Sequence, residues 1–177
     1  MKRLLGISGS LRRESFNTKL VHEAFRQYGA CEANVADLNL PLYNQDVEDE
    51  GMPASVTALK EQVEAADALI IATPEYNKNP PGVLKNALDW LSRFRPMPTA
   101  GKPTVILSAT AGGAGGQRAQ SALYLMLVPF DVDVLANPEV FVGAAHTKFG
   151  EDGTMSDQAT ADFLAKKMAL LRARLEG

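Results

Sequence analysis

The sequence has 177 residues, of which 46% are hydrophobic and 22% are charged, so it suits one soluble globular domain with a sizeable core. Its formal net charge of −3 gives no reason to expect nucleic acid or an anionic membrane surface as a partner, and its single cysteine, Cys31, excludes an intramolecular disulfide. No apolar run approaches the roughly 18 residues of a membrane span and no signal-peptide pattern precedes the first strand, so we expect a cytoplasmic protein.

The first predicted element is a short apolar strand, residues 4–7, which stops at a loop of small hydroxyl residues before a helix begins near Phe16. A strand, a polar loop and a helix in this order build an anion site, because the free N–H groups and the dipole of the helix N-terminus favour negative charge. In the alternative interpretation, Ser15 or Asn17 only caps the helix and the two arginines of the loop are solvated. The side chains that could donate hydrogen bonds to phosphate oxygens are Ser8, Ser10, Arg12, Ser15 and Asn17.

Three better-known motifs do not fit this loop. A Walker loop needs Gly-Lys-Ser/Thr after its glycines, and none is present. A dinucleotide fingerprint needs a third glycine after Gly6 and Gly9, and a nucleophile elbow needs glycine where Ser10 stands. The loop therefore predicts a phosphate site of another kind.

The next part of the chain predicts a helix that Gly29 ends, a short strand at 31–35, a polar and turn-rich segment at 37–53, and a helix at 54–65. A segment as long as 37–53 is often functional in a compact domain, for example as a wall or a lid. Cys31 lies in the alternating run of the second strand, and we interpret it as a small buried residue.

Residues 68–72 are apolar without alternation, which is the pattern of a strand buried on both faces of a parallel sheet. The elements that follow are, in order, a loop at 74–82, a helix at about 83–95, a strand at 105–107 that ends at Ser108, a loop at 109–116, a helix at 117–128, short strands at 132–135 and 140–142, and a helix at about 156–175.

Strands and helices that alternate five times predict a single α/β domain, residues 1–177, built on a doubly wound, five-stranded parallel sheet with helices on both faces. In such sheets, ligands bind beyond the carboxyl ends of the strands, where the strand order reverses. The three unusual loops follow the first, third and fourth strands, which are neighbours in the order 2-1-3-4-5. We therefore expect these loops to converge on one site.

Each of the three loops carries a recognisable motif. The first holds Gly9-Ser10-Leu11-Arg12 with Ser15 and Asn17. The second holds Pro74-Glu75-Tyr76-Asn77, and it is followed by Pro81-Gly82, Leu84-Lys85-Asn86-Ala87 and Asp89-Trp90. The third holds Gly115-Gly116 with Arg118-Ala119-Gln120. Together, and over nearly the whole chain, they resemble the NAD(P)H-dependent FMN reductase family, the flavodoxin-like quinone, azo-dye and chromate reductases.

This resemblance implies a flavodoxin-like fold, an FMN cofactor and NAD(P)H as co-substrate. The FMN phosphate would lie in the first loop, the flavin ring against the second loop, and the other flavin edge against the third. The residues implied to contact FMN are Ser10, Arg12, Ser15, Phe16, Asn17, Pro74, Glu75, Tyr76, Asn77, Ser108, Gly112 and Gly113.

The second loop, residues 74–77, would lay backbone N–H groups and the Tyr76 ring along the isoalloxazine, and the prolines would stiffen the loop. Simpler roles stand beside these: Tyr76 as a plain rim aromatic, Glu75 as a solvated carboxylate, and the glycines of 112–116 as a flexible connection. The sequence departs from the family pattern at Tyr124, where an arginine is common.

The resemblance also implies a ping-pong reaction in which hydride passes from NAD(P)H to FMN, and a quinone, azo compound, chromate or similar acceptor then takes the electrons. Because this chemistry belongs to the cofactor, no catalytic side chain is predicted. No cysteine or carboxylate stands at metal-ligand spacing beside His22 or His146, so no metal site is predicted. The alternatives are a flavin reductase that supplies reduced FMN to a monooxygenase, a flavodoxin-type electron carrier, and a flavin-free regulator.

The helices at 83–95 and 117–128 are apolar most of the way round, which requires burial on two sides. We expect a homodimer through these helices, with further assembly into a tetramer as such families show; the alternative is thicker packing within one subunit. The residues of the two outer stripes are Val83, Trp90 and Phe94 in the first helix and Tyr124, Leu125 and Val128 in the second.

Overall fold

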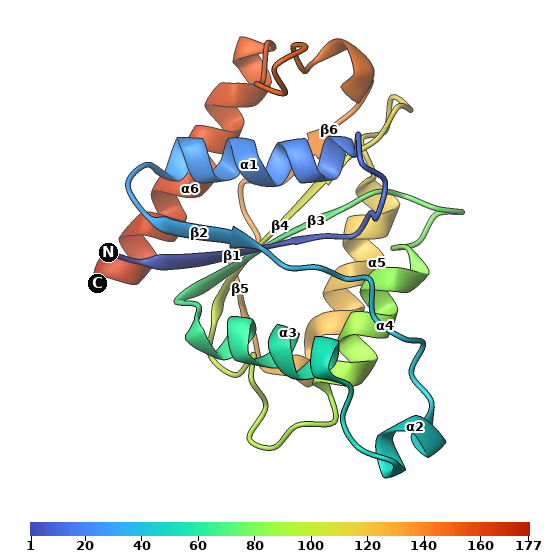
Figure 1. Cartoon of the computed structure of the whole chain (residues 1–177). Helices are drawn as coiled ribbons and strands as arrows, with labels where there is room; N and C mark the ends of the chain where they lie inside the picture. Colours follow the sequence, from blue (N-terminus) through green and yellow to red (C-terminus); the bar gives the residue numbers. More distant parts are fainter.

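The computed structural model describes the whole chain, residues 1–177, as one parallel sheet between two layers of helices (Figure 1). The strands follow the order β2-β1-β3-β4-β5, and β6 also pairs with β4. The predicted doubly wound α/β fold and its strand order are therefore confirmed. The strands are β1 (Arg3–Ser8), β2 (Glu32–Val35), β3 (Ala68–Thr73), β4 (Pro103–Ala109), β5 (Asp133–Val134) and β6 (Val140–Val142).

The fifth position of the sheet is divided into two pieces. The start of β4 pairs with β5, in the register Pro103↔Asp133, and the end of β4 pairs with β6, in the register Ala109↔Val142. Residues 135–139 leave the sheet between the two pieces, as the two separate strands predicted from the sequence require.

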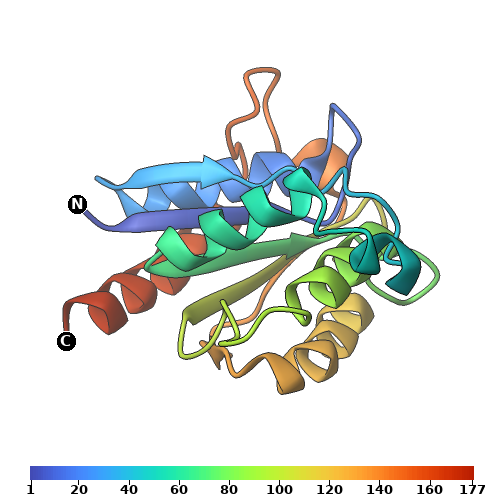
Figure 2. The same ribbon diagram turned by 60° about the horizontal axis from the view of Figure 1, so that its bottom comes forward.

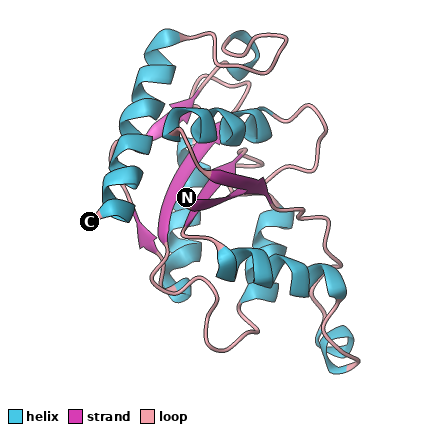
Figure 3. Ribbon diagram, turned by 60° about the vertical axis from the view of Figure 1, so that its left-hand side comes forward, coloured by secondary structure: helices cyan, strands magenta, loops and turns pink.

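Two core clusters explain how the helices divide between the faces of the sheet. Successive residues of a strand point to opposite faces. Leu4 and Ile70 pack under α1 and α6, whereas their neighbours Leu5 and Ile71 pack under α3, α4 and α5. Figures 2 and 3 show these two layers on either side of the sheet. The helices are α1 (Phe16–Tyr28), α2 (Gln45–Asp49), α3 (Ala54–Ala65), α4 (Gly82–Leu91), α5 (Gln117–Leu127) and α6 (Gln158–Glu176), with 3-10 turns at Val128–Phe130 and Ala145–Thr147.

Local chemistry explains several element boundaries, of which the sequence predicted the one at Gly29. Helix α1 ends at Gly29, whose backbone has a φ of 94°, and α6 begins after Asp157, whose carboxylate accepts a hydrogen bond from the Thr160 N–H at 2.9 Å. Helix α4 ends at Leu91, before the predicted 95, because the N–H groups of Arg93 and Phe94 donate to carbonyls three residues earlier and no longer four. No helix combines the length and apolar character needed to cross a bilayer.

The prediction that Cys31 is fully buried is wrong, because the residue is only half-buried. It precedes β2, which is the edge strand of the sheet and is largely exposed. Partial burial still raises the pKa of its thiol.

The assignment of Trp90 to an outer, partner-facing stripe of α4 is also wrong, because the long segment 37–53 covers it completely. The Pro41 carbonyl accepts hydrogen bonds from Trp90 Nε1 at 2.8 Å and from Asn86 Nδ2 at 2.9 Å, and the Tyr43 ring meets the indole edge-on. The alternative of thicker packing within one subunit holds at this position. The same contacts place the 37–53 segment against α4, so it forms no wall of the pocket described below.

Candidate functional site

The three loops converge at the carboxyl edge of the sheet, as predicted, and enclose a pocket of about 280 Å³. In Figure 1 they lie together on the side of the molecule opposite the two chain termini. Parallel strands bring their carboxyl ends to one edge, so loops that are far apart in the sequence become neighbours. The pocket is lined by Ser10, Arg12, Ser15, Phe16 and Asn17 from the first loop and the start of α1, by Pro74, Glu75 and Tyr76 from the second loop, and by Ala109, Thr110 and Ala111 at and after the end of β4.

The first loop forms a positively charged end of the pocket with free hydrogen-bond donors. Arg12 is exposed, has no carboxylate partner, and lies with its guanidinium carbon 5.4 Å from the centre of the Phe16 ring. The backbone N–H groups of residues 10, 11, 13 and 14 donate to no acceptor within the chain. A cation beside unpaired amides is the donor set that a phosphate requires.

Ser15 caps the helix, which is one of the two roles that the sequence left open, and its phosphate contact stays a prediction. Its Oγ caps α1 by accepting hydrogen bonds from the N–H groups of Asn17 at 3.2 Å and Thr18 at 3.4 Å. The hydroxyl proton is not used by these contacts and remains available to a ligand in the pocket. The cap interpretation is thus confirmed for Ser15, and it is compatible with a phosphate contact.

Asn17 joins the first loop to the third, which the sequence did not indicate. Its Nδ2 donates to the Ala109 carbonyl at 2.9 Å, and its Oδ1 accepts from the Ala109 N–H at 3.0 Å. The side chain is almost fully buried, and both of its polar atoms are engaged. Asn17 therefore lines the pocket chiefly as a link between loops.

The second loop is a tight turn in which one backbone N–H is already hydrogen-bonded within the loop. The Tyr76 N–H donates to the Asn79 carbonyl at 2.9 Å and the Asn79 N–H donates back at 3.0 Å, while Asn77 and Lys78 have left-handed backbones. The expectation that the N–H groups along this loop are free is therefore wrong for Tyr76, although the Glu75 and Asn77 amides remain unpaired. The Tyr76 ring is 54% exposed at the pocket rim.

Glu75 is not the solvated carboxylate that one interpretation of the sequence suggested. Its Oε2 accepts hydrogen bonds from the N–H groups of Arg118 at 3.1 Å and Ala119 at 3.2 Å, in the first turn of α5. The carboxylate thus links the second loop to the helix that follows the third.

Ser108 does not line the pocket, although the sequence placed it among the contact residues. It is completely buried, donates to the Gly115 carbonyl and accepts from Gln120 Nε2 at 2.8 Å. A side chain at Gly116, which has a φ of 88°, would collide with it. Ser108 therefore braces the turn into α5, and the pocket wall comes from the residues immediately after it.

That wall, Ala109 to Ala111, is not among the predicted contact residues, because two alanines and one threonine carry little chemical signal. The informative signal is positional, since the wall begins at the last residue of β4 and continues beyond it, as Pro74 follows β3. Gly112 and Gly113 are exposed and stand just beyond the wall, as does Asn77 in the second loop. The amides of 111–114 donate to no acceptor within the chain, so this loop offers a second set of free donors.

The first and second loops also touch directly. A Cβ atom at Gly9 would come within 3.1 Å of Pro74 Cδ and 3.2 Å of Pro81 Cγ, so any larger residue would push the two prolines away by a few tenths of an ångström. All three pairs of loops are therefore in contact, through Gly9, Asn17 and Glu75.

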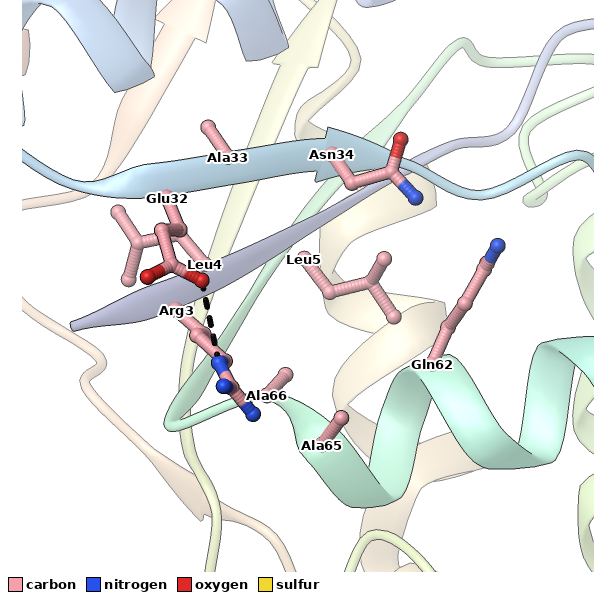
Figure 4. Close-up of a pocket in the computed structure, with 9 residues that line it drawn as sticks. All are labelled: Arg3, Leu4, Leu5, Glu32, Ala33, Asn34, Gln62, Ala65 and Ala66. Carbon is pink, nitrogen blue, oxygen red and sulfur yellow. Dashed lines mark hydrogen bonds and ion pairs between the residues drawn. The ribbon is translucent and has the colours of Figure 1, made fainter. Parts of the chain in front are cut away.

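A second hollow, of about 190 Å³, lies near the start of β1, away from these loops (Figure 4). Leu4, Leu5 and three alanines form much of its wall, and the Arg3–Glu32 ion pair at 3.2 Å stands at one side. It carries none of the free amides and unpaired cations that distinguish the pocket at the carboxyl edge.

Comparison with known proteins gives consistent matches over the full chain. The profile of the family described as NADPH-dependent FMN reductase matches residues 2–147. The NAD(P)H-dependent FMN reductase of Pseudomonas aeruginosa is 42% identical over 172 residues, covering 96% of this chain and 93% of that one, and the quinone reductase of Escherichia coli is 42% identical over 166 residues, covering 90% and 88%. Among solved structures, the flavoenzyme NAD(P)H:acceptor oxidoreductase FerB of Paracoccus denitrificans superposes with a TM-score of 0.90 at 31% identity, covering 99% of this chain and 98% of that one.

Proposed function

The chain belongs to the NADPH-dependent FMN reductase family, and we propose from this premise which of its residues hold the cofactor and which partners it takes. It is an NAD(P)H-dependent oxidoreductase that uses FMN, and it reduces a small-molecule acceptor. When bound, FMN supplies the redox chemistry, by accepting hydride from NAD(P)H and releasing the electrons to the acceptor. The protein's own residues have to bind, orient and shield this group.

The observation that carries the assignment of the site is the convergence of the three loops on a pocket with one cationic end. We place the FMN phosphate at that end, where Arg12 donates a charge-assisted hydrogen bond and Ser10, Ser15 and the unpaired loop amides donate neutral ones. Arg12 has no competing carboxylate, so its charge is available to the phosphate.

The flavin ring lies, in this proposal, between the second and third loops. Pro74 and the half-exposed Tyr76 ring offer apolar surface to one part of the ring, and the free amides of 111–114 lie where they can donate to its polar edge. Donors at that edge stabilise negative charge on the reduced ring. In this proposal, Gly112 and Gly113, which stand just beyond the pocket wall, contact the flavin through these backbone amides.

We propose a ping-pong reaction with a quinone as acceptor. The pocket has an exposed rim at Tyr76, so donor and acceptor would use the same opening in turn. The quinone reductases among the relatives favour a quinone over an azo compound or chromate. Steady-state kinetics with NADPH and a benzoquinone would give parallel double-reciprocal lines. Intersecting lines would refute the ping-pong mechanism.

The direct test of the function uses the purified protein loaded with FMN and freed of excess. We expect a retained visible flavin absorbance that disappears when NADPH is added without oxygen and returns when quinone is added. Retained flavin that NADPH does not reduce would indicate an electron carrier, an alternative that the reductase relatives disfavour. Rapid loss of reduced flavin into solution would instead favour delivery of reduced FMN to a monooxygenase.

We propose that the protein forms a homodimer through α4 and α5. Leu125 and Val128 are each 75% exposed, and beside them runs a groove of about 440 Å³ between the two helices. Apolar side chains this exposed beside a groove are typical of an interface. The apolar part of the groove is formed by Leu88, Met97, Leu125, Met126, Pro129 and Phe130.

A second exposed pair, Phe163 at 52% and Leu170 at 48%, lies two turns apart on α6 and would support assembly of dimers into a tetramer. Light scattering at micromolar concentration decides between these states, and a monomer would refute both. We also propose a cytoplasmic location, where reduced nicotinamide cofactors are supplied; cell fractionation tests it.

A further inference from the structure

Helix α5 begins without a cap of its own. Its N-cap residue is Gly116, which has no side chain, and its first turn contains no acidic residue. The unpaired N–H groups and the positive dipole end of such a helix attract an anion. In a protein that binds a phosphorylated cofactor, this helix end would be an obvious place for the phosphate.

The anion that occupies this position is the side chain of Glu75. One oxygen, Oε2, accepts hydrogen bonds from both Arg118 N–H and Ala119 N–H, at 3.1 and 3.2 Å, and the Arg118 guanidinium lies 3.8 Å from the other oxygen. The side chain is only 16% exposed, although the two partners stand 43 and 44 residues later in the chain. The helix is thus capped by another loop.

The position of Tyr76 depends on this contact. Its hydroxyl has no hydrogen-bond partner and its ring has no aromatic neighbour, so the position of the ring depends largely on the backbone that carries it. That backbone belongs to the turn that projects beyond the sheet in Figure 1, with Asn77 and Lys78 in left-handed conformations. The turn is held on one side by Pro74 against Gly9, and on the other by the Glu75 carboxylate.

We propose that Glu75 is a positioning residue: by capping α5 its carboxylate fixes the loop that carries Tyr76, and so sets the affinity for FMN through the shape of the pocket. This inference rests on the proposed function, in which the flavin lies against that loop. The same contact closes the N-terminus of α5 to phosphate, which leaves the first loop as the anion site.

The test compares Glu75→Ala, Glu75→Gln and a matched control, Glu48→Ala. Glu48 is a similarly shielded carboxylate, with 18% side-chain exposure and an ion pair to Arg93 at 2.8 Å, but it forms no part of the pocket. We expect Glu75→Ala to raise the Kd for FMN about tenfold, which corresponds to about 1.4 kcal/mol, because the loop that carries Tyr76 would then have to be ordered on binding. Glu75→Gln should restore most of the affinity, because an amide oxygen still accepts both N–H groups, and Glu48→Ala should leave the Kd unchanged.

A second readout needs no cofactor. Hydrogen exchange of the Arg118 and Ala119 amides in the FMN-free protein should accelerate in Glu75→Ala and not in Glu48→Ala. If exchange accelerates in Glu75→Ala but the Kd for FMN is unchanged, the cap has a purely structural role. If exchange is unchanged, the contact is absent in solution. Either result overturns the proposal. Failure of the wild-type protein to bind FMN would instead refute the proposed function. The exchange data would still show whether Glu75 caps α5.

Discussion

Replacing Arg12 by alanine is the sharpest test of where the phosphate lies. Arg12 is the cation of the pocket, and it forms no ion pair with any carboxylate of the chain. A hydrogen bond to a charged group contributes about 1.5–3 kcal/mol, and because Arg12 is exposed we take a value near 2 kcal/mol. At 1.4 kcal/mol for each tenfold, the Kd for FMN should rise about thirtyfold in Arg12→Ala.

The fold should be spared by this change. The only contact that Arg12 loses within the chain is the one over the Phe16 ring, which contributes about 0.5–1 kcal/mol at an exposed site. The thermal midpoint of the FMN-free variant should therefore move by only a few degrees. Titration of flavin fluorescence gives the Kd, and differential scanning calorimetry gives the midpoint.

Two further variants separate charge from shape. Arg13→Ala removes a neighbouring exposed cation that does not line the pocket, so its Kd should change by less than about twofold. Arg12→Lys keeps the charge without the planar fork, so its Kd should lie between those of wild type and Arg12→Ala. An Arg12→Ala protein that binds FMN as tightly as wild type would refute the phosphate assignment.

Three other predictions follow from the same structure. Asn17→Ala should lower the free energy of unfolding by about 2 kcal/mol, because two hydrogen bonds to Ala109 of about 1 kcal/mol each are lost; an unchanged urea midpoint would contradict this. Burial lowers the pKa of Lys167 from 10.5 to about 8, so between pH 8 and 10.5 the unfolded chain binds more protons than the folded one. The free energy of unfolding of the wild type should therefore rise with pH relative to that of Lys167→Met. Denaturant unfolding at pH 7.5 and pH 10 measures that difference, and equal pH slopes in the two proteins would contradict it. Leu125→Asp combined with Val128→Asp should convert the proposed dimer into a monomer in light scattering, since each side chain is 75% exposed on the proposed interface, whereas a dimer mass that stays unchanged would contradict this interface.

Much of the fold was readable from the sequence because apolar runs report burial directly. The unbroken run at 68–72 predicts a strand buried on both faces, and β3 is buried at every position. The positions of the three loops after strand ends then predict their convergence, since parallel strands share one carboxyl edge. The two short strands before α6 were likewise predicted, and they share the fifth position of the sheet.

The links between the loops could not be predicted in the same way. Asn17 bonds to Ala109 and Glu75 bonds to Ala119 across separations of 92 and 44 residues, and single polar contacts of this kind leave no periodic pattern. The burial of Trp90 was missed for a related reason, because the covering segment contacts it through the Pro41 carbonyl, a backbone group that no side-chain pattern reveals. The bracing role of the Ser108 side chain could not be predicted, because a serine at a strand end looks alike whether it faces a ligand or braces a turn.

These links explain how a pocket built from loops can be ready to bind. Many of the donors near the pocket are backbone amides. Ordering the backbone of one residue costs about 1–2 kcal/mol, so an amide binds a ligand more tightly when the chain around it is already ordered. Three contacts join the loops in pairs: the side chains of Asn17 and Glu75 and the close approach at Gly9. The loops therefore lose their conformational entropy when the protein folds and not when FMN binds. Substitutions at these three positions should therefore weaken FMN binding although none removes a donor from the phosphate end, whereas Arg12→Ala removes a donor and leaves the links intact.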